Sequence, residues 1–175
     1  MNNKYELTDE KKEIGGITFR RIRALREIPR FGVKSGDLGG WIESESNLSQ
    51  DGDAWVSGNA RVSGNAWVSG NAWVYGNAWV YGNARVYGNA RVYGDARVYG
   101  NADYMVFKNS WSSGRWFTYT RSNKMWSVGC FYGTGEELVR KAYVDSEVSG
   151  KCYEAIVRAV EAIEAAKAEA KGDVK

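Results

Sequence analysis

The stretch "NAWVYGNAWVYGNARVYGNARVYG", running from Asn71 to Gly94, decides the fold of this chain because it repeats every six residues. It belongs to a longer run from Ala54 to Asn101, in which eight consecutive hexads follow one order: Ala, Trp or Arg, Val, Ser or Tyr, Gly, Asn or Asp. Each unit of so regular a repeat can bury its apolar face only against its neighbours. The repeat is therefore interpreted before any local propensity.

Alternation within each hexad predicts a short strand. The segments "AWVY" and "ARVY" alternate small apolar, large, apolar and large residues, which is the period-two pattern of a strand. Ala and Val then share one face, and Trp or Arg shares the other face with Tyr or Ser. The Gly-Asn pair that follows tolerates unusual backbone angles, so we expect a four-residue strand and then a corner in every hexad.

Two architectures place a corner after each strand. In a meander, Gly-Asn would form a tight hairpin turn. In a solenoid, the chain bends in one direction and coils around its own Ala/Val face. We favour the solenoid, because a flat meander of such short strands would expose that face unless a second layer covered it.

The order Val, any residue, Gly, Asn, Ala, any residue resembles the hexapeptide-repeat left-handed β-helix. That resemblance implies a left-handed parallel β-helix with three hexads in each triangular coil, so that each residue stacks on the one 18 positions later. Upstream, Ile42, Leu48 and Gly52 echo the repeat more weakly and indicate one irregular coil. We therefore expect about four coils in all.

A second resemblance covers nearly the whole chain. The segments "GDLGGWIESESNLSQDGDAWV" and "NSWSSGRWFTYTRSNKMWSVGCFYGTGEEL" resemble proteins encoded by bacteriophages and prophages, some of them described as polymer-forming. The resemblance implies a setting in the cytosol of a bacterial host and suggests a counter-defence role there.

Both ends of a solenoid need a cover, because an open coil presents unpaired strand edges. We predict an N-terminal strand cap over residues 1–32, the repeat helix over 33–103 and a C-terminal α+β module over 104–175. In that module "RWFTYT" and "KMWSVGCF" predict a hairpin. Thr134 and Glu137 match a capping box that opens a helix near Gly135, and a second helix is expected from about Lys151.

Composition excludes several classes of protein. The 175 residues include no histidine, so catalytic triads and histidine-zinc sites are excluded, and we expect no enzyme activity, no metal and no cofactor. Cys130 and Cys152 are too few for a disulfide framework and are interpreted as buried, reduced thiols. The polar N-terminus and short apolar runs predict a cytosolic chain without a membrane span, and a net charge of +3 does not suit duplex DNA.

Outward residues of the hexads should form columns at the 18-residue spacing. Trp73 would then lie beside Arg91, Trp79 beside Arg97, and Trp67 beside Arg85. Arginine planes over aromatic rings stabilise such columns, so a purely structural role is favoured. The same residue types also grip nucleotides, with guanidinium groups on phosphates and rings on bases. A third possibility is a subunit interface, and the hexapeptide resemblance implies a trimer.

The C-terminal hairpin concentrates further aromatic and basic residues, at least half of which we expect in the core. The arginine-rich segment "RRIRALREIPR", which ends at Arg30, could receive an anion, but a solvated strand face is the favoured interpretation. The candidate ligand-binding residues are Trp73, Trp79, Arg85, Arg91, Arg97, Tyr87, Tyr93, Trp111, Arg115 and Arg121.

These patterns favour a non-enzymatic binding protein that forms a homo-oligomer and either sequesters a nucleotide-type immune signal or blocks a host defence protein. The alternative is a structural protein, either a component of the phage particle or a self-assembling scaffold. End-to-end growth would require an uncapped end, and we predict a cap at both ends of the solenoid. An acyltransferase, which the repeat alone would suggest, is disfavoured because the chain lacks histidine.

Overall fold

The computed structural model describes residues 4–172, with side chains described as far as residue 170. The chain divides into two compact units, Met1–Cys130 and Phe131–Lys175.

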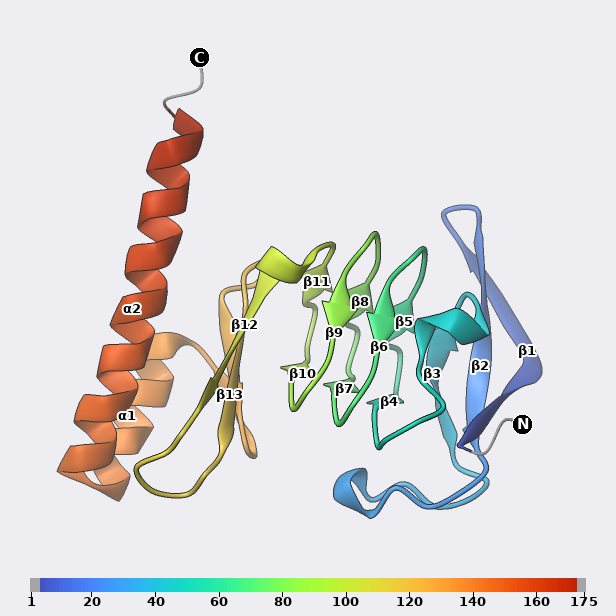
Figure 1. Cartoon of the computed structure of the whole chain (residues 1–175), viewed down its shortest axis with the longest axis horizontal. Coiled ribbons are helices and arrows are strands. Elements are labelled where there is room, and N and C mark those ends of the chain that lie inside the picture. Colours follow the sequence, from blue (N-terminus) through green and yellow to red (C-terminus); the bar gives the residue numbers. More distant parts are fainter. Residues whose placement is uncertain (1–3, 173–175) are drawn as a thin grey trace. The chain divides into compact units, whose positions relative to one another are not determined.

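The first unit is built around a β-solenoid of about three turns (Figure 1). Its eight strands are two residues long, shorter than the four residues expected, because in each hexad only the large residue and the following Val are paired as strand. The strands are β4 (Trp55–Val56), β5 (Arg61–Val62), β6 (Trp67–Val68), β7 (Trp73–Val74), β8 (Trp79–Val80), β9 (Arg85–Val86), β10 (Arg91–Val92) and β11 (Arg97–Val98).

Strands pair in parallel with the strand three hexads later, which confirms the 18-residue stacking. Trp55 pairs with Trp73, and Trp73 with Arg91. The other two faces follow the same rule, with β5, β8 and β11 in one sheet and β6 and β9 in another. Three strands therefore make one turn of the solenoid.

The inward face is made of Ala and Val alone in the regular hexads. Every Ala from Ala54 to Ala96 and every Val from Val56 to Val98 in the repeat is 0% exposed. Side chains of this size suit a solenoid whose three faces lie close together. The corner glycines from Gly58 to Gly94 have positive φ, as at Gly76 with φ 74°, a conformation that glycine adopts without steric cost.

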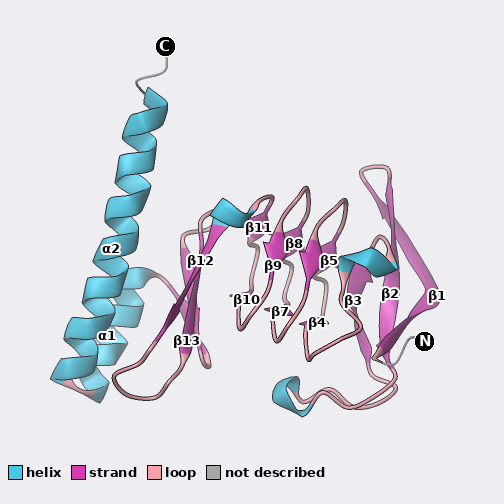
Figure 2. Ribbon diagram, viewed as in Figure 1, coloured by secondary structure: helices cyan, strands magenta, loops and turns pink. Residues whose placement is uncertain are grey.

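An antiparallel hairpin extends one face of the solenoid at its N-terminal end (Figure 2). Strand β1 (Tyr5–Ile14) pairs with β2 (Ile17–Ala24), and β2 pairs with β3 (Leu38–Ile42). Strand β3 then pairs in parallel with β5, with Ile42 opposite Val62. Leu48 forms a bridge with Val68. The weak upstream echoes of the repeat thus occupy the positions of an irregular coil, as expected.

The backbone of the solenoid has a direction that decides what can close each end. Amide groups donate toward the C-terminal end, as from Trp55 N to Ala72 O and from Trp73 N to Ala90 O, both 2.9 Å. The N-terminal end therefore presents carbonyl oxygens. Donors meet them there: Lys4 Nζ donates to Ala54 O (2.8 Å), and Asn47 Nδ2 donates to Ala66 O (2.9 Å).

The C-terminal end presents amide groups, and side-chain oxygens accept from them. Asn101 Oδ1 accepts from Arg85 N, Thr118 Oγ1 from Arg91 N, and Ser122 Oγ from Arg97 N, at 2.8, 2.9 and 2.7 Å. These acceptors come from an antiparallel sheet and the turns around it, and its strands are β12 (Tyr104–Lys108), β13 (Trp116–Thr120) and β14 (Met125–Val128). The predicted hairpin of β13 and β14 is confirmed, and β12 adds a third strand that was not predicted.

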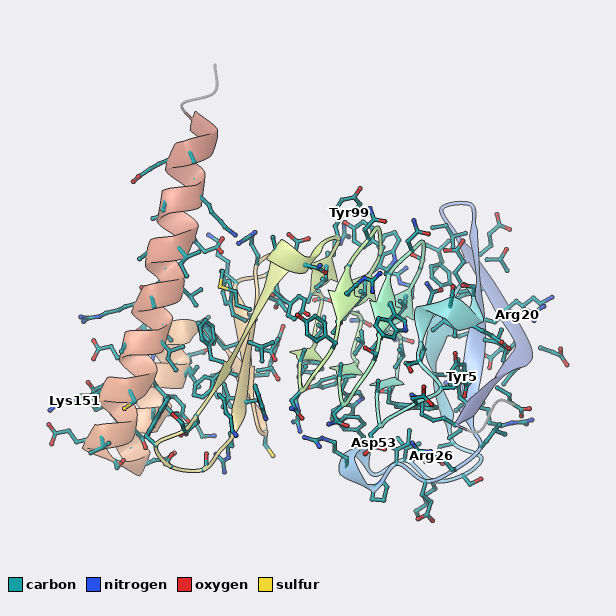
Figure 3. The ribbon with its side chains drawn as sticks, in the orientation of Figure 1. Tyr5, Arg20, Arg26, Asp53, Tyr99 and Lys151 are labelled. Carbon is teal, nitrogen blue, oxygen red and sulfur yellow. The ribbon has the colours of Figure 1, made fainter. Side chains whose placement is uncertain are left out.

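Three short 3-10 helices connect these elements: η1 (Pro29–Phe31), η2 (Glu45–Asn47) and η3 (Asn101–Asp103). Figure 3 shows Tyr5, which is fully buried and donates from its hydroxyl to Leu48 O at 2.7 Å. The same view labels Arg26 and Asp53, which form an ion pair of 3.3 Å.

The second unit holds β15 (Phe131–Gly133), α1 (Gly135–Asp145) and α2 (Glu147–Gly172). The capping box is confirmed, since Thr134 Oγ1 accepts from Glu137 N and the Glu137 carboxylate accepts from Thr134 N. Helix α2 begins at Glu147, earlier than expected, and buries Tyr153, Val157 and Val160. No helix among the described residues is long and apolar enough to span a membrane.

The prediction of two buried thiols is wrong. Cys130 is exposed and lies in a turn after β14 rather than in a strand, and Cys152 on α2 is half-buried. The reason for the first difference is that β14 ends at Val128, two residues before the cysteine.

Candidate functional site

Arginine and tryptophan side chains form the predicted columns on the outer faces of the solenoid. The guanidinium carbon lies 4.9 Å from the ring centre between Arg61 and Trp79, and 5.7 Å between Arg85 and Trp67. Arg91 lies over Trp73 at 5.8 Å. Exposed contacts of this kind stabilise a fold by roughly 0.5–1 kcal/mol each. The columns therefore have a structural role, whatever else their members do.

Trp73 and Tyr93 belong to a continuous aromatic stack. Ring centres are 4.7 Å apart between Phe31 and Trp73, then 4.1 Å between Trp73 and Tyr75 and 4.1 Å between Tyr75 and Tyr93. Trp73 Nε1 also donates to Ser57 Oγ at 2.9 Å. Burial raises the pKa of Tyr75. Because Trp73 has an aromatic ring stacked on it and a paired indole nitrogen, its contacts are those of a structural residue.

Trp79 has equivalent partners on the next face. Its ring stacks on Tyr81 with centres 4.6 Å apart, and its Nε1 donates to Ser63 Oγ at 2.9 Å. Trp55, at the start of the first column, is only 1% exposed because the N-terminal strands cover it. Trp79 therefore has the contacts of a structural residue, as Trp73 does.

A cationic cleft of about 270 Å³ lies within the first unit, and we call it the arginine cleft. It is lined by Arg30, Asn71, Asn89, Arg91, Ser113, Gly114, Arg115, Trp116 and Gly129. Three of these residues carry a guanidinium group. None of the lining residues in the described part of the chain is Asp or Glu.

Segments far apart in the sequence bring the three arginines together. Arg30 comes from η1, Arg91 from β10, and Arg115 from the loop before β13. Neutral oxygens hold two of them: Arg30 Nη2 donates to Asn89 Oδ1 at 2.6 Å, and Arg91 Nη1 donates to Gly129 O at 2.8 Å. These bonds orient the guanidinium groups and leave their positive charge uncompensated.

Several other arginines of the same unit are paired with carboxylates. Arg21 pairs with Glu10 at 3.2 Å, Arg23 pairs with Glu6, and Arg121 lies 3.9 Å from Asp103. Such pairs cancel charge at the surface and contribute little else. The arginine cleft differs from them because its cations converge on a common space.

A second cleft of about 390 Å³, here the tyrosine cleft, adjoins the first. It is lined by Tyr87, Gly88, Asn89, Asn101, Tyr104, Val106 and Trp116, so the two clefts share Asn89 and Trp116. Tyr104 Oη donates to Arg85 O at 2.7 Å, and burial raises the pKa of Tyr104 to about 12. Its phenol is therefore neutral near physiological pH.

Of the ten candidate residues, the structure brings Arg91 and Arg115 together in the arginine cleft and places Tyr87 in the tyrosine cleft beside it. The remaining candidates lie in the columns, in the aromatic stack or in contacts of the C-terminal sheet, such as that of Trp111 with Phe117 at 6.2 Å between ring centres. They are Trp73, Trp79, Arg85, Arg97, Tyr93, Trp111 and Arg121.

The candidate residues chosen from the sequence do not include four that line the clefts: Arg30, Asn89, Tyr104 and Trp116. Arg30 stands in the arginine-rich segment and is solvent-exposed, as expected, but it lies in η1 rather than on a strand, and its guanidinium group donates to Asn89. Asn89 could have been found from the sequence, because it is one of the corner residues that the repeat places in a column. What the repeat cannot give is the position of η1.

Comparison with protein families agrees with this architecture. The family model described as the YdcK β-solenoid repeat matches residues 54–70, 66–82, 72–88, 78–94, 84–100 and 90–114. The matched windows overlap and cover the strands from β4 to β11. The chain is thus a β-solenoid repeat protein. A comparison with curated proteins found no match.

Proposed function

We propose that this protein is a non-enzymatic binding protein that holds a nucleotide by its phosphates in the arginine cleft. The observation that carries the proposal is the convergence of Arg30, Arg91 and Arg115 on one cleft whose described lining contains no carboxylate. Like charges held close together repel one another, and a bound anion relieves that repulsion.

The chemistry of the arginine side chain supports a phosphate ligand in particular. A guanidinium group presents planar, paired N–H donors that match two phosphate oxygens, and charge-assisted hydrogen bonds of this kind are stronger than neutral ones. Arg30 and Arg91 are each anchored by a neutral oxygen, so binding does not require an existing ion pair to break.

The composition of the cleft also supports binding without catalysis. Its described lining consists of Arg, Asn, Ser, Gly and Trp, and it includes no Asp, Glu, Cys or Lys that would act as a general base. Ser113 is the one hydroxyl among the lining residues, and no base among them could activate it.

The biological setting is part of the same proposal and rests on the resemblance to phage and prophage proteins. We propose a left-handed solenoid that acts as a homo-oligomer, a trimer in the hexapeptide pattern, in the cytosol of a bacterial host. There it sequesters a nucleotide immune signal and so protects the phage. A host defence protein as the target is the competing possibility within this setting.

A self-assembling scaffold has less support, because growth by stacking requires open ends. Lys4 and Asn47 donate to carbonyls at the N-terminal end, and Thr118 accepts from Arg91 N at the other. Groups that are paired within the chain cannot template another coil.

Equilibrium binding measured by calorimetry tests the proposal. The probes are ATP, GTP, CTP, UTP, two cyclic dinucleotides (c-di-AMP and c-di-GMP) and tripolyphosphate. We expect at least one nucleotide to bind, and the Arg30→Gln/Arg115→Gln double variant to weaken its binding at least tenfold. Arg85→Gln/Arg97→Gln is the matched control, because it also removes two arginine charges from the same unit but at positions that line neither cleft.

Two outcomes would overturn the proposal. One is that none of the probes binds; a host protein captured by the wild-type chain would then identify the competing function. The other is that the Arg30→Gln/Arg115→Gln variant binds as tightly as the wild type while it remains folded by circular dichroism.

A further inference from the structure

We infer that the ligand spans both clefts, with its phosphates in the arginine cleft and its base in the tyrosine cleft. This inference rests on the proposed function and adds to it the site that recognises the base. The observation behind it is that Asn89 and Trp116 line both clefts, so the two clefts are immediate neighbours.

The two clefts differ in chemistry in the way that the two ends of a nucleotide differ. The lining of the tyrosine cleft includes three aromatic residues and Val106, and none of its described lining residues is charged. The lining of the arginine cleft carries three positive charges. A ligand matched to both has a flat, uncharged end and an anionic end. Inorganic phosphate or polyphosphate would use the arginine cleft alone.

Stacking supplies the affinity in the tyrosine cleft. Tyr87 is 59% exposed, so its ring is available to a base. Trp116 is half-buried, and Lys108 Nζ lies 5.7 Å from the centre of its ring. Tyr104 is held by its hydrogen bond to Arg85 O. Tyr87 is therefore the principal stacking residue, and Trp116 and Tyr104 form the fixed walls.

The side-chain amides of Asn89 and Asn101 offer hydrogen-bond donors to a ligand. Asn89 Oδ1 accepts from Arg30, and Asn101 Oδ1 accepts from Arg85 N. Because these bonds fix which amide atom is the oxygen, the NH₂ groups are the donors that a ligand meets. Ring nitrogens and carbonyl oxygens of a base are acceptors, so the donors and acceptors match.

The size of the site fits such a ligand. Small-molecule sites usually measure about 300–1,000 Å³. The arginine cleft, at about 270 Å³, falls short of that range by itself, and the tyrosine cleft adds about 390 Å³ beside it.

The test compares nucleotides with tripolyphosphate, which has the anionic end but no base. We expect the tightest nucleotide of the panel to bind at least tenfold more tightly than tripolyphosphate. Tyr87→Ala should weaken that nucleotide about tenfold, an effect of roughly 1.4 kcal/mol, and leave tripolyphosphate unchanged. Tyr87→Phe keeps the ring and should retain the affinity.

Tyr99→Ala is the matched control. Tyr99 occupies the same hexad position as Tyr87, is equally exposed at 59%, and lines neither cleft. Figure 3 shows Tyr99 at the outer edge of the solenoid. Its substitution should leave the binding of every probe unchanged.

The outcomes separate this inference from the proposed function. If nucleotides and tripolyphosphate bind equally and Tyr87→Ala changes nothing, the base site is wrong and the arginine cleft stands as an anion site. If Tyr87→Ala weakens nucleotides while the Arg30→Gln/Arg115→Gln variant does not, the arginine cleft is wrong and the ligand is held by its base. A cooperative thermal unfolding transition, measured for each variant, checks that the variant is folded.

Discussion

Lys4 Nζ donates a 2.8 Å hydrogen bond to the carbonyl oxygen of Ala54, fifty residues further along the chain. The lysine is 0% exposed, and Ala54 begins the first regular hexad. A buried ammonium group is unusual, because removal of a charge from water is costly. Here the donor covers a carbonyl at the end of the solenoid where no earlier strand supplies an amide.

Lys4 should make the stability of the protein depend on pH. Burial lowers the pKa of Lys4, and the charge of Arg26 lowers it further. The charges of Asp53 and Asp51 act in the opposite direction, and the net result is a pKa of about 8 in place of the usual 10.5. Between these values the unfolded chain binds more protons than the folded one, so stability rises with pH. We expect the free energy of unfolding to increase by about 1–2 kcal/mol between pH 7.5 and 9.5.

Urea denaturation at the two pH values measures this change. Lys4→Met should remove the pH dependence, whereas Lys34→Met, at an exposed position, should retain it. The pH range of the experiment ends below pH 10, because burial raises the pKa of Tyr5 and of Tyr104 in the folded protein. Above pH 10 the unfolded chain would lose these protons first, and the protein would lose stability. An unchanged slope in Lys4→Met would contradict the assignment.

Thr118 should be essential to the C-terminal end of the solenoid. Thr118 is 1% exposed, and its hydroxyl accepts from Arg91 N, whose strand lies at the end of its sheet. Thr118→Val leaves that amide buried without a partner, which costs about 1–3 kcal/mol. Ser122→Ala is the control: it removes a similar bond from Arg97 N at an exposed site, where water replaces it. Equal losses in the two variants, measured by denaturation, would refute the distinction.

Gly39 should tolerate no side chain. A Cβ there would lie 2.5 Å from Ile22 Cγ1 and 2.7 Å from Trp55 Cζ2, and both neighbours are buried. We expect Gly39→Ala to destabilise the protein by about 1–3 kcal/mol, as overpacked cores do. Gly100→Ala is the control, because a Cβ there meets nothing within 4 Å and φ is −144°. A melting temperature that is unchanged in Gly39→Ala would show that β3 can move away from the solenoid.

Cys130 should be the thiol that reacts first with an aromatic disulfide reagent. It is exposed, whereas Cys152 is half-buried on α2. We expect two kinetic phases of equal amplitude in the native protein and the loss of the fast phase in Cys130→Ser. Loss of the slow phase instead would reverse the assignment of the two thiols.

The repeat allowed much of the fold to be predicted, because its chemistry is local and periodic. Ala and Val alternate with large residues, so the buried face follows from the pleat of a strand. The pairing of Trp73 with Arg91 follows from the 18-residue period. The capping box of Thr134 and Glu137 was equally predictable, since both residues lie within one helical turn. Strand length was not, because it depends on which backbone groups pair.

The candidate site was predicted only in part. Residue type selects Arg91 and Arg115, but the same rule selects Trp73, Trp79 and Arg85, which line neither cleft. Arg91 itself lies both in a column, over Trp73, and in the arginine cleft. Composition identifies side chains able to bind a nucleotide. It does not say whether such a side chain faces an open cleft or a neighbouring ring.

The sequence by itself therefore determined the solenoid, its inward Ala and Val, and the columns on its outer faces. Only the tertiary structure decided that Arg30, Arg91 and Arg115 line one cleft. The physical reason is distance along the chain. A six-residue period constrains neighbouring coils, whereas η1 and the loop before β13 reach the same corner of the solenoid through turns and contacts that have no period.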